Sequence, residues 1–398
     1  MNKIIALACL IIACITYSCN SGSDTNVKQV PQIQSSERVF YDFDIRNCLD
    51  QNGELWLSSK AREIQYIPLE TTPSCFLSRC RQVEIFNKKI YVLDTKALYK
   101  FDLDGSFIQQ IGKIGNGPGE YGSVLWFNFI DSTNEIVLYS FPTGRINVHD
   151  AESGEFKRSF SLDFDPNGVI EFPPGKLSFL TWNTRQSENQ ESRSEIYICN
   201  LEGDILDSIP DERIPSTGNI AGPNHYYVFN KSLNYMEFFQ DTLYSLSEDA
   251  MKEKYASFGL NNKVNVYQLE LKNQIGVNQF PDFLRIDEVL ETERSFFITV
   301  EKGLGFNIPE ESIKFFYDKS SGQTVNCTSV INDLDDGMPF WPKSIYKDSV
   351  LIDFYPAIEF LEYFQTNTDD QGRPEFLEKL IRSVDVNDNP IVILTSQL

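Results

Sequence analysis

The chain has 398 residues, of which 41% are hydrophobic and 13% aromatic, and its formal net charge is −22 at pH 7. This acidic charge, without any basic cluster, would repel a polyanion over most of the chain, so we expect no nucleic-acid partner. The aromatic content suits the pleated, half-buried surfaces of β-sheets, and the length is sufficient for a large all-β body.

The first residues of the chain have the pattern of an export signal. Lys3 supplies a positive start, and the apolar run of residues 4–15 is too short to span a bilayer as a stable helix. The stretch Thr16-Tyr17-Ser18-Cys19 resembles a bacterial lipoprotein processing site, in which the cysteine becomes the acylated first residue. Cys14 is a competing match, but it would leave a very short apolar core. An ordinary secretory signal is the other alternative.

This pattern predicts a lipoprotein signal peptide over residues 1–18 and lipidation at Cys19. The polar stretch of residues 20–36 then reads as a flexible tether within a lipidated N-terminal extension, residues 19–61. We therefore expect an exported protein of the cell envelope, held to a membrane, the outer membrane by preference, through its lipid.

A turn recurs along the chain at a fixed distance. An apolar or aromatic strand runs into Asp or Asn and then Gly, with the glycines at Gly105, Gly154 and Gly203, each 49 residues after the one before. Asp and Asn side chains bond the backbone beyond them and so favour such turns. A fixed period of this length, with strands and no helix between turns, is typical of a radial array of four-stranded blades. The sequence predicts an all-β fold, a β-propeller.

Four segments carry a resemblance to a known family. They are Glu63–Thr72, Ile90–Asp94, Phe101–Gly105 and, most specifically, Gly115–Tyr121. Together they resemble the six-bladed β-propeller lipoproteins of Bacteroidetes, a family related to NHL-type propellers. The resemblance is strong over residues 62–160, and it implies a secreted or lipid-anchored propeller whose biochemical role is largely unassigned.

The strand pattern divides residues 62–398 into six blades. Successive blades are expected near 80–111, 124–162, 169–209, 225–260, 283–330 and 342–394. The last blade is one strand short, and the N-terminal strand 63–69 can supply the missing outer strand. This pairing would close the ring and leave no open sheet edge between blades.

Two insertions interrupt the regular period, and insertions in a propeller map to loops on one face. The first is the polar stretch Asn183–Ser194 in blade three. The second spans residues 357–389 in blade six, where apolar residues recur at helical spacing and Pro374 marks a helix start. We expect a short helical insertion there, which either covers a blade edge or forms a lid over the channel mouth.

The glycine-rich segment 112–122 joins the first two blades and carries the sharpest local signal. It is either a tight corner that needs close backbone approach or a loop that reaches the central funnel. Aromatic rings stack on sugars or fill peptide pockets, and Arg and Glu make directional polar contacts. The candidate ligand-binding residues are therefore Lys113, Asn116, Glu120, Tyr121, Trp126, Arg145 and Trp182. Trp126 has a structural alternative, packing between blades.

Cysteine and histidine are poorly arranged for catalysis. Beyond the leader and the anchor Cys19, the cysteines are Cys48, Cys75, Cys80, Cys199 and Cys327. This odd number excludes a complete disulfide framework, although Cys75 and Cys80 are close enough in sequence to pair. There are two histidines and no CxxC pair. We expect no catalytic residue set, no metal site in the sequence pattern and no cofactor.

Three classes of function are compatible with these features. The first is a non-catalytic module that binds a glycan, a peptide or an envelope protein through loops at one mouth of the channel. The second is a metal-dependent hydrolase or lactonase, similar to six-bladed sugar-lactone enzymes with an axial divalent ion. The third is an architectural subunit of an envelope complex.

Overall fold

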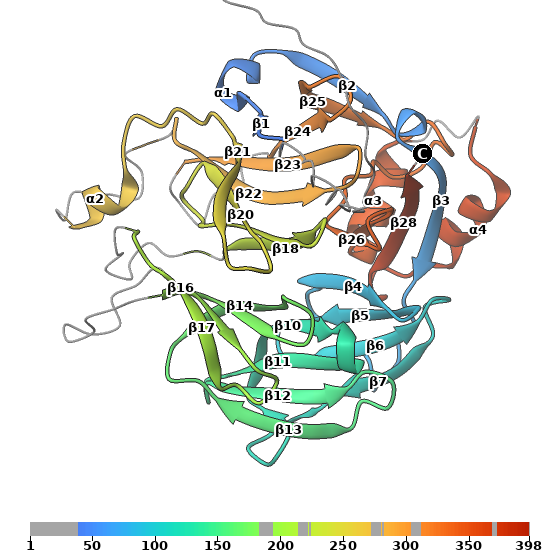
Figure 1. The fold of residues 1–398 in the computed structure, drawn as a ribbon. Helices are drawn as coiled ribbons and strands as arrows, with labels where there is room; N and C mark the ends of the chain where they lie inside the picture. The colour runs from blue at the N-terminus through green and yellow to red at the C-terminus, as the bar shows by residue number, and fades with distance from the viewer. Residues whose placement is uncertain are drawn as a thin grey trace, which may run out of the picture. The chain divides into compact units, whose positions relative to one another are not determined.

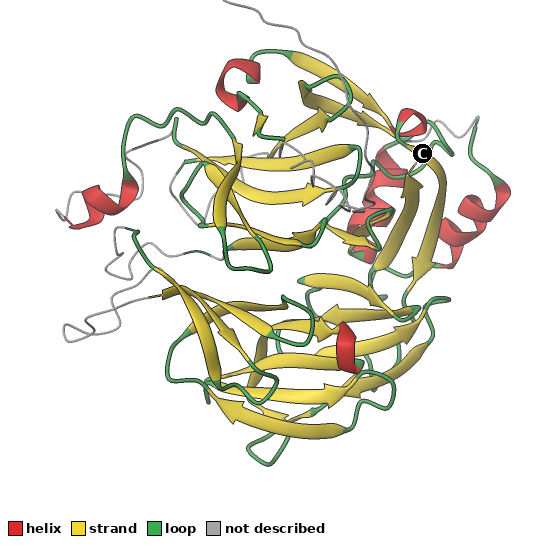
Figure 2. Cartoon of the chain, viewed as in Figure 1, coloured by secondary structure: helices red, strands yellow, loops and turns green. Residues whose placement is uncertain are grey.

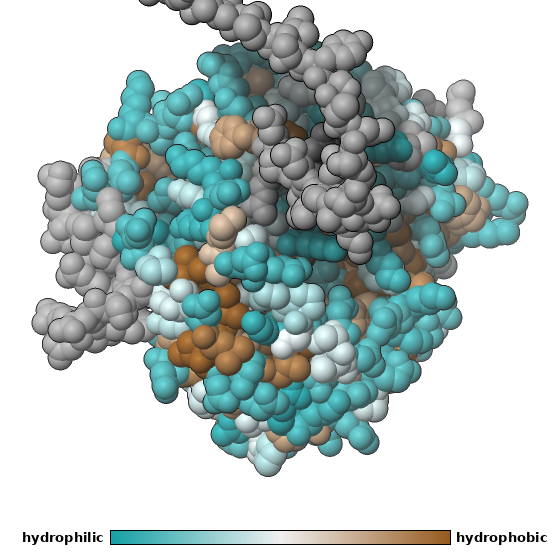
Figure 3. All heavy atoms as spheres, in the orientation of Figure 1, coloured by the Kyte–Doolittle hydropathy of each residue, from teal (hydrophilic) through white to brown (hydrophobic). Residues whose placement is uncertain are grey.

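The computed structural model describes residues 39–182, 194–213, 222, 224–271, 280, 282–303, 312–367 and 372–397. Over these residues the chain forms six sheets around a common axis, and the predicted class, a six-bladed β-propeller, is confirmed (Figure 1). Figure 2 shows how strongly strands dominate and that the few helices lie at the edges of the sheets. The viewed face is largely hydrophilic, as the net charge of −22 leads one to expect (Figure 3).

The first three blades are four-stranded antiparallel sheets whose strands follow chain order. Blade one holds β4 (Gln82–Phe86), β5 (Lys89–Leu93), β6 (Leu98–Asp102) and β7 (Phe107–Ile111). Blade two holds β10 (Ser123–Ile130), β11 (Glu135–Phe141), β12 (Arg145–Asp150) and β13 (Phe156–Ser161), with a 3₁₀ turn, Asp131–Thr133, after β10. Blade three holds β14 (Pro166–Glu171), β15 (Leu177–Thr181), β16 (Ser194–Cys199) and β17 (Ile205–Pro210).

The other three blades each take a strand from the N-terminal segment at the outer edge. Blade four holds β18 (His225–Phe229), β19 (Ser232–Met236), β20 (Thr242–Leu246) and β21 (Lys252–Ser257), and β1 (Tyr41–Asp42) adds to β21 in parallel. Blade five holds β22 (Leu284–Glu291), β23 (Ser295–Lys302), β24 (Ile313–Asp318) and β25 (Gln323–Ile331), and β2 (Asn52–Trp56) adds to β25 in parallel. Blade six holds β26 (Ser344–Tyr346), β27 (Val350–Tyr355), β28 (Ile391–Gln397) and β3 (Ala61–Pro68).

The N-terminal segment therefore runs along the outside of three consecutive blades. Between β1 and β2 lies α1 (Ile45–Cys48), and a 3₁₀ turn, Leu57–Ser59, precedes β3. Phe43 and Ile45 are fully buried between blades four and five. The compact unit begins at Phe40, whereas the sequence pattern had placed its start at residue 62. β3 pairs antiparallel with β28 from Pro68 opposite Ile391 to Ala61 opposite Gln397, in the position that the incomplete last blade required.

Apolar side chains fill the spaces between neighbouring blades. Separate clusters lie between each adjacent pair, and the one between blades one and two contains Tyr91, Phe127 and Leu138. The free cysteines include the buried Cys75 and the half-buried Cys80, so the disulfide that their spacing allowed is not formed. No helix in the described ranges is both long and apolar enough to cross a membrane.

Loops leave the sheets at two opposite ends. Because the strands of each blade alternate in direction, the second-to-third-strand loops and the connections between blades share one end, called here the connection end. The short first-to-second and third-to-fourth turns share the other end. The longer connections, including those that carry α2 (Val266–Leu271), α3 (Ala357–Thr366) and α4 (Glu375–Ser383), thus belong to the connection end.

The helical insertion predicted in the last blade is present as α3 and α4. Phe360 and Phe364 of α3 and Leu377 of α4 pack into the cluster between blades five and six. The ring of Tyr66, on the outer strand β3, lies 6.2 Å from that of Phe360. The apolar sides of both helices therefore cover the edge of a blade, and the lid alternative is not supported.

Candidate functional site

The glycine-rich segment 112–122 lies against the outer strands of blade two. Gly119 has a φ of +73°, and a Cβ atom there would lie 2.6 Å from the ring of Phe156 on β13. Asn147, on β12, donates a hydrogen bond to the Glu120 backbone oxygen (3.1 Å). The segment itself contains a short parallel pair, β8 (Lys113–Ile114) and β9 (Glu120–Tyr121). The geometry therefore fits the first of the two alternatives, a tight corner between blades.

The four candidate side chains of this segment lie at the corner between blades one and two. Tyr121 is 0% exposed and donates its hydroxyl proton to the Ile111 oxygen (2.6 Å), so it belongs to the core between blades one and two. The Glu120 carboxylate accepts from the Gly117 N–H (2.8 Å) within the loop. Lys113 and Asn116 are exposed on the same loop. None of these four side chains is positioned on an axial strand.

The other three candidates separate into two kinds. Trp126 is buried, and its ring stacks on Tyr139 with centroids 5.1 Å apart, between blades two and three. Trp126 thus packs between blades, which is the alternative that the sequence left open for it. Arg145 begins β12 and Trp182 follows β15, both half-buried at the connection end of neighbouring blades. Their participation in one site stays a prediction. The insertion expected at Asn183–Ser194 lies outside the described residues, except for Ser194 itself.

The first strands of the blades surround the axis and carry a different set of polar groups. β26 contacts β4, β10 contacts β14, and β18 contacts β22. The pairing of β10, β14 and β22 with the second strands of their blades is interrupted by a shift in register. In β22 the shift falls between Ile286 and Glu288. Such bulges redirect side chains and are frequent next to functional sites.

Glu84 lies in the middle of β4, between the buried Val83 and Ile85. Burial raises the pKa of its carboxyl group to about 7, although a hydrogen bond from the Gln82 amide (3.1 Å) acts in the opposite direction. A carboxyl group with this pKa is partly protonated at neutral pH. Its environment is therefore far less able to stabilise the charge than water.

Asp287 and Glu288 are adjacent on β22, at the bulge. Burial is the main cause that raises the pKa of Glu288 well above its usual value, and the charge of Asp287 is the second. Glu84, on blade one, makes a smaller contribution that also raises this pKa. We call Glu84, Asp287 and Glu288 the axial acid cluster.

Tyr226 and His225, on β18, complete this polar surface. Burial raises the pKa of Tyr226 to about 12, with a smaller contribution from Glu84. Its ring lies directly over Gly168 of β14, where a Cβ atom would overlap it. Burial lowers the pKa of His225, opposed by the charge of Asp287, and His225 Nε2 lies 3.2 Å from the Ile286 oxygen. The imidazole of His225 is therefore neutral at neutral pH.

Within the described chain no cation is bonded to Glu84, Asp287 or Glu288, of which Glu84 and Glu288 are half-buried and Asp287 is exposed. Several fully buried carboxylates, in contrast, are paired with a cation between or within blades. Three such pairs are Glu135 with Arg158 (2.8 Å), Glu291 with Lys319 (2.5 Å) and Asp353 with Lys343 (2.7 Å). Lys343 is the cation that lowers the pKa of Glu288, but its ammonium group is bonded to Asp353. A desolvated acid without a counter-ion costs stability, and such groups concentrate at functional sites.

The sequence reasoning missed this cluster. Its members come from strands some 200 residues apart, so no local motif joins them. One local signal was available, an acidic residue inside an otherwise apolar strand, as in Val83-Glu84-Ile85. Within the described ranges no three His, Cys, Asp or Glu side chains are grouped so that they could hold a metal ion.

Comparisons with known proteins support the fold. The sequence family described as "Domain of unknown function (DUF4934)" matches residues 40–396. A solved structure of a Bacteroides fragilis protein described as exported is 20% identical, with a TM-score of 0.69 over 90% of this chain and 99% of that chain. A member of the DUF4221 family from Bacteroides vulgatus is 13% identical, with a TM-score of 0.47 over 85% of this chain and 97% of that one. No functionally curated protein matches the chain.

Proposed function

We propose a function for this chain, which belongs to the DUF4934 family, described as a domain of unknown function. The protein is an NHL-like propeller lipoprotein of the cell envelope that binds a ligand without catalysis. The ligand enters the channel from the connection end and presents a cationic group to the axial acid cluster. In chemical terms this group is the ammonium or guanidinium of a basic side chain in a peptide or envelope-protein partner.

The observation that carries this proposal is that no cation among the described residues is bonded to Glu84 or Glu288. Charge-assisted hydrogen bonds to a ligand ammonium or guanidinium would replace the missing counter-ion. Neutralisation by the ligand would also remove the repulsion between the acids, which gives binding a favourable electrostatic term. The net charge of −22 attracts a basic partner over the whole surface and speeds its approach.

We expect the tripeptides Gly-Lys-Gly and Gly-Arg-Gly to bind, and Gly-Glu-Gly not to bind, in isothermal titration calorimetry at pH 8. The Glu84→Gln/Glu288→Gln variant should bind at least about tenfold more weakly, because both neutral amides lack the charge that pairs with the ligand. Glu155→Gln is the matched control, because Glu155 lies in an exposed turn at the opposite end of blade two. Equal binding by the double variant and the unmodified protein would move the site away from the axis.

A metal-dependent hydrolase is the second candidate, since carboxylates are also the ligands that hard divalent cations prefer. The described residues do not fit this use well, because they lack a group of three or more suitable ligands. Metal analysis of the purified protein distinguishes the two candidates. One stoichiometric divalent ion, lost in Glu84→Gln, would favour the hydrolase over the binding protein.

The export and anchoring part of the proposal rests on the leader sequence, and the similar Bacteroides fragilis protein described as exported supports it. We expect Cys19→Ala to shift the protein from the detergent phase to the aqueous phase in detergent phase separation. Its melting temperature should not change, because residue 19 lies outside the compact unit that begins at Phe40. Cys14→Ala is the control, and loss of detergent partitioning in that variant instead would assign the lipid to Cys14.

A further inference from the structure

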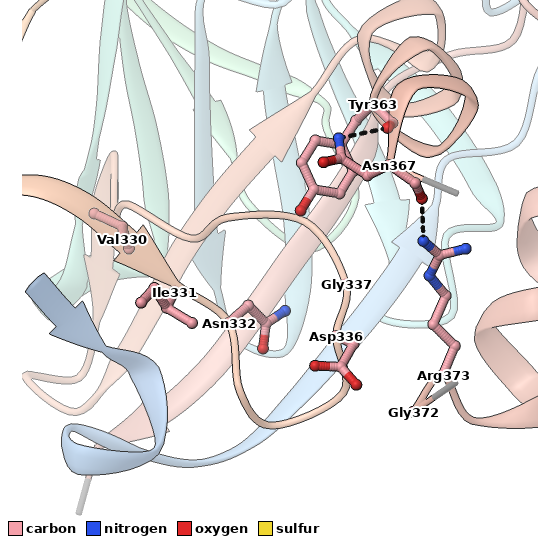
Figure 4. Close-up of a pocket in the computed structure, with 9 residues that line it drawn as sticks. All are labelled: Val330, Ile331, Asn332, Asp336, Gly337, Tyr363, Asn367, Gly372 and Arg373. Carbon is pink, nitrogen blue, oxygen red and sulfur yellow. Dashed lines mark hydrogen bonds between the residues drawn. The ribbon is translucent and has the colours of Figure 1, made fainter. Parts of the chain in front are cut away.

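We propose that a cavity of about 390 Å³ between blades five and six binds one ring of a neutral sugar. The cavity lies where the end of β25, the connection from β25 to β26, the end of α3 and the segment before α4 meet (Figure 4). Its volume is in the range of small-molecule sites. It shares no residue with the axial acid cluster, so it stands independently of the function proposed above.

One wall of the cavity is fixed by its own hydrogen bonds. The Asn332 amide donates to the Asp335 carboxylate (2.7 Å) and to the Met338 oxygen (2.9 Å). The Tyr66 hydroxyl, on β3, donates to the same carboxylate (3.3 Å). These bonds hold the connection against blade six. A preformed wall lowers the entropic cost of binding a small ligand.

Arg373 forms the opposite wall. Its side chain is only 6% exposed, and its guanidinium lies 4.8 Å from the centre of the Phe364 ring. It donates to the Asn367 backbone oxygen and lies 3.6 Å from the Glu378 carboxylate. Figure 4 shows the guanidinium directed toward Asn367 at one side of the cavity. Arg373 therefore holds its N–H groups in a fixed position, and Glu378 compensates its charge.

Asp336 and Tyr363 supply groups that other described residues do not use. Asp336 is exposed, with a left-handed φ of +52°, and its carboxylate has no hydrogen bond within the described chain. Burial raises the pKa of Tyr363, so its hydroxyl stays protonated and is a donor. Figure 4 shows the Tyr363 hydroxyl and the Asp336 carboxylate bordering the same space. Both groups are thus placed to bond a ligand.

This combination selects a hydroxylated, uncharged ligand. Each sugar hydroxyl both donates and accepts, so neighbouring hydroxyls can donate to Asp336 and accept from Tyr363 or Arg373. The apolar face of the sugar ring can pack on Val330 and Ile331, which also line the cavity. Asp336 disfavours carboxylates and phosphates, because like charges brought together repel.

The test is saturation-transfer-difference NMR with glucose, galactose, mannose and N-acetylglucosamine, each at millimolar concentration. We expect at least one sugar to bind the full chain in a saturable way. Asp336→Asn removes the charge but keeps a residue that tolerates a left-handed φ, and Tyr363→Phe removes only the hydroxyl. Each variant should weaken binding by about tenfold or more at an unchanged melting temperature.

Glu362→Gln is the matched control, because Glu362 is exposed on α3 and does not line the cavity. Binding should be unchanged in this variant. The proposal is overturned if none of the four sugars binds, or if both cavity variants bind as the unmodified protein does. Loss of sugar binding in Glu84→Gln with retention in Asp336→Asn would also overturn it, since the sugar would then occupy the channel. If no sugar binds but free glycine does, and if this binding depends on Asp336, the ligand of the cavity is an amino acid and the sugar proposal is overturned.

Discussion

A chain that begins at Thr72 is expected to lose several kcal/mol of unfolding free energy and to aggregate. Such a chain lacks β3, which pairs with β28 along its whole length and closes blade six. It also lacks the buried side chains of Ile67 and Leu69, which are 2% and 3% exposed. The loss leaves an unpaired edge on β28, and an open edge is a template for association with other chains. Urea unfolding and light scattering measure the two effects.

Two other starting points separate the contributions of the N-terminal strands. A chain that begins at Phe40 retains the compact unit and should unfold like the mature protein. A chain that begins at Ala61 keeps β3 but loses β1, β2 and the buried Phe43, so its stability should lie between the other two. If the Thr72 chain unfolds at the same urea concentration as the Phe40 chain, β3 does not contribute to ring closure in solution.

The propeller could be predicted because the same turn chemistry recurs in successive blades. Asp102 accepts a hydrogen bond from the Leu103 N–H (2.7 Å), and Asn200 accepts one from the Asp204 N–H (2.8 Å). Asp150 accepts one from the Ser153 N–H (2.8 Å). These bonds are local, so their residues are close in sequence and their spacing can be read directly. The spacing indicates the propeller, and the count of six blades comes from the strand pattern and the family resemblance.

The start of the compact unit could not be read in this way. β1 has two residues, and β2 alternates weakly between polar and apolar positions, so neither has a recognisable strand pattern. Both are strands because an outer strand of a blade was available for parallel pairing. Tertiary context of this kind overrides local propensity. The apolar residues of the stretch from β1 to β2 that are buried in the structure, Phe43, Ile45 and Leu55, are too few and too irregularly spaced to form a strand pattern.

The candidate site was harder to predict than the fold for a related reason. The glycine-rich segment has a distinctive sequence because its backbone passes close to Phe156, which is a packing requirement. The sequence left a structural corner and a binding loop as alternatives, and a packing requirement of this kind cannot be told from a binding motif without the fold. The raised pKa values of Glu84 and Glu288 come mainly from burial in the folded chain, and at Glu288 also from the charge of Asp287. That information exists only in the folded chain.

The same burial predicts a measurable effect of pH on stability. The pKa of Glu84 is raised from 4.5 to about 7 in the folded state. Below pH 4.5 the carboxyl group is protonated in both states and has no effect on the unfolding free energy. Between pH 4.5 and 7 the unfolded state releases the proton first, so the unfolding free energy falls as the pH rises. Above pH 7 the loss is complete and constant.

Glu84→Gln is therefore expected to raise the unfolding free energy by roughly 1–3 kcal/mol at pH 8 and to leave it nearly unchanged at pH 4. The comparison is made by urea unfolding of both proteins at each pH, so that all other titrating groups cancel. Glu155→Gln, in an exposed turn, should show no such difference. A Glu84→Gln variant that is destabilised equally at pH 4 and pH 8 would show that the Gln82 hydrogen bond, rather than desolvation, dominates at this position. If the variant is stabilised at pH 8 and also loses the tripeptides, the acid is kept for binding at the expense of stability, as is common at functional sites.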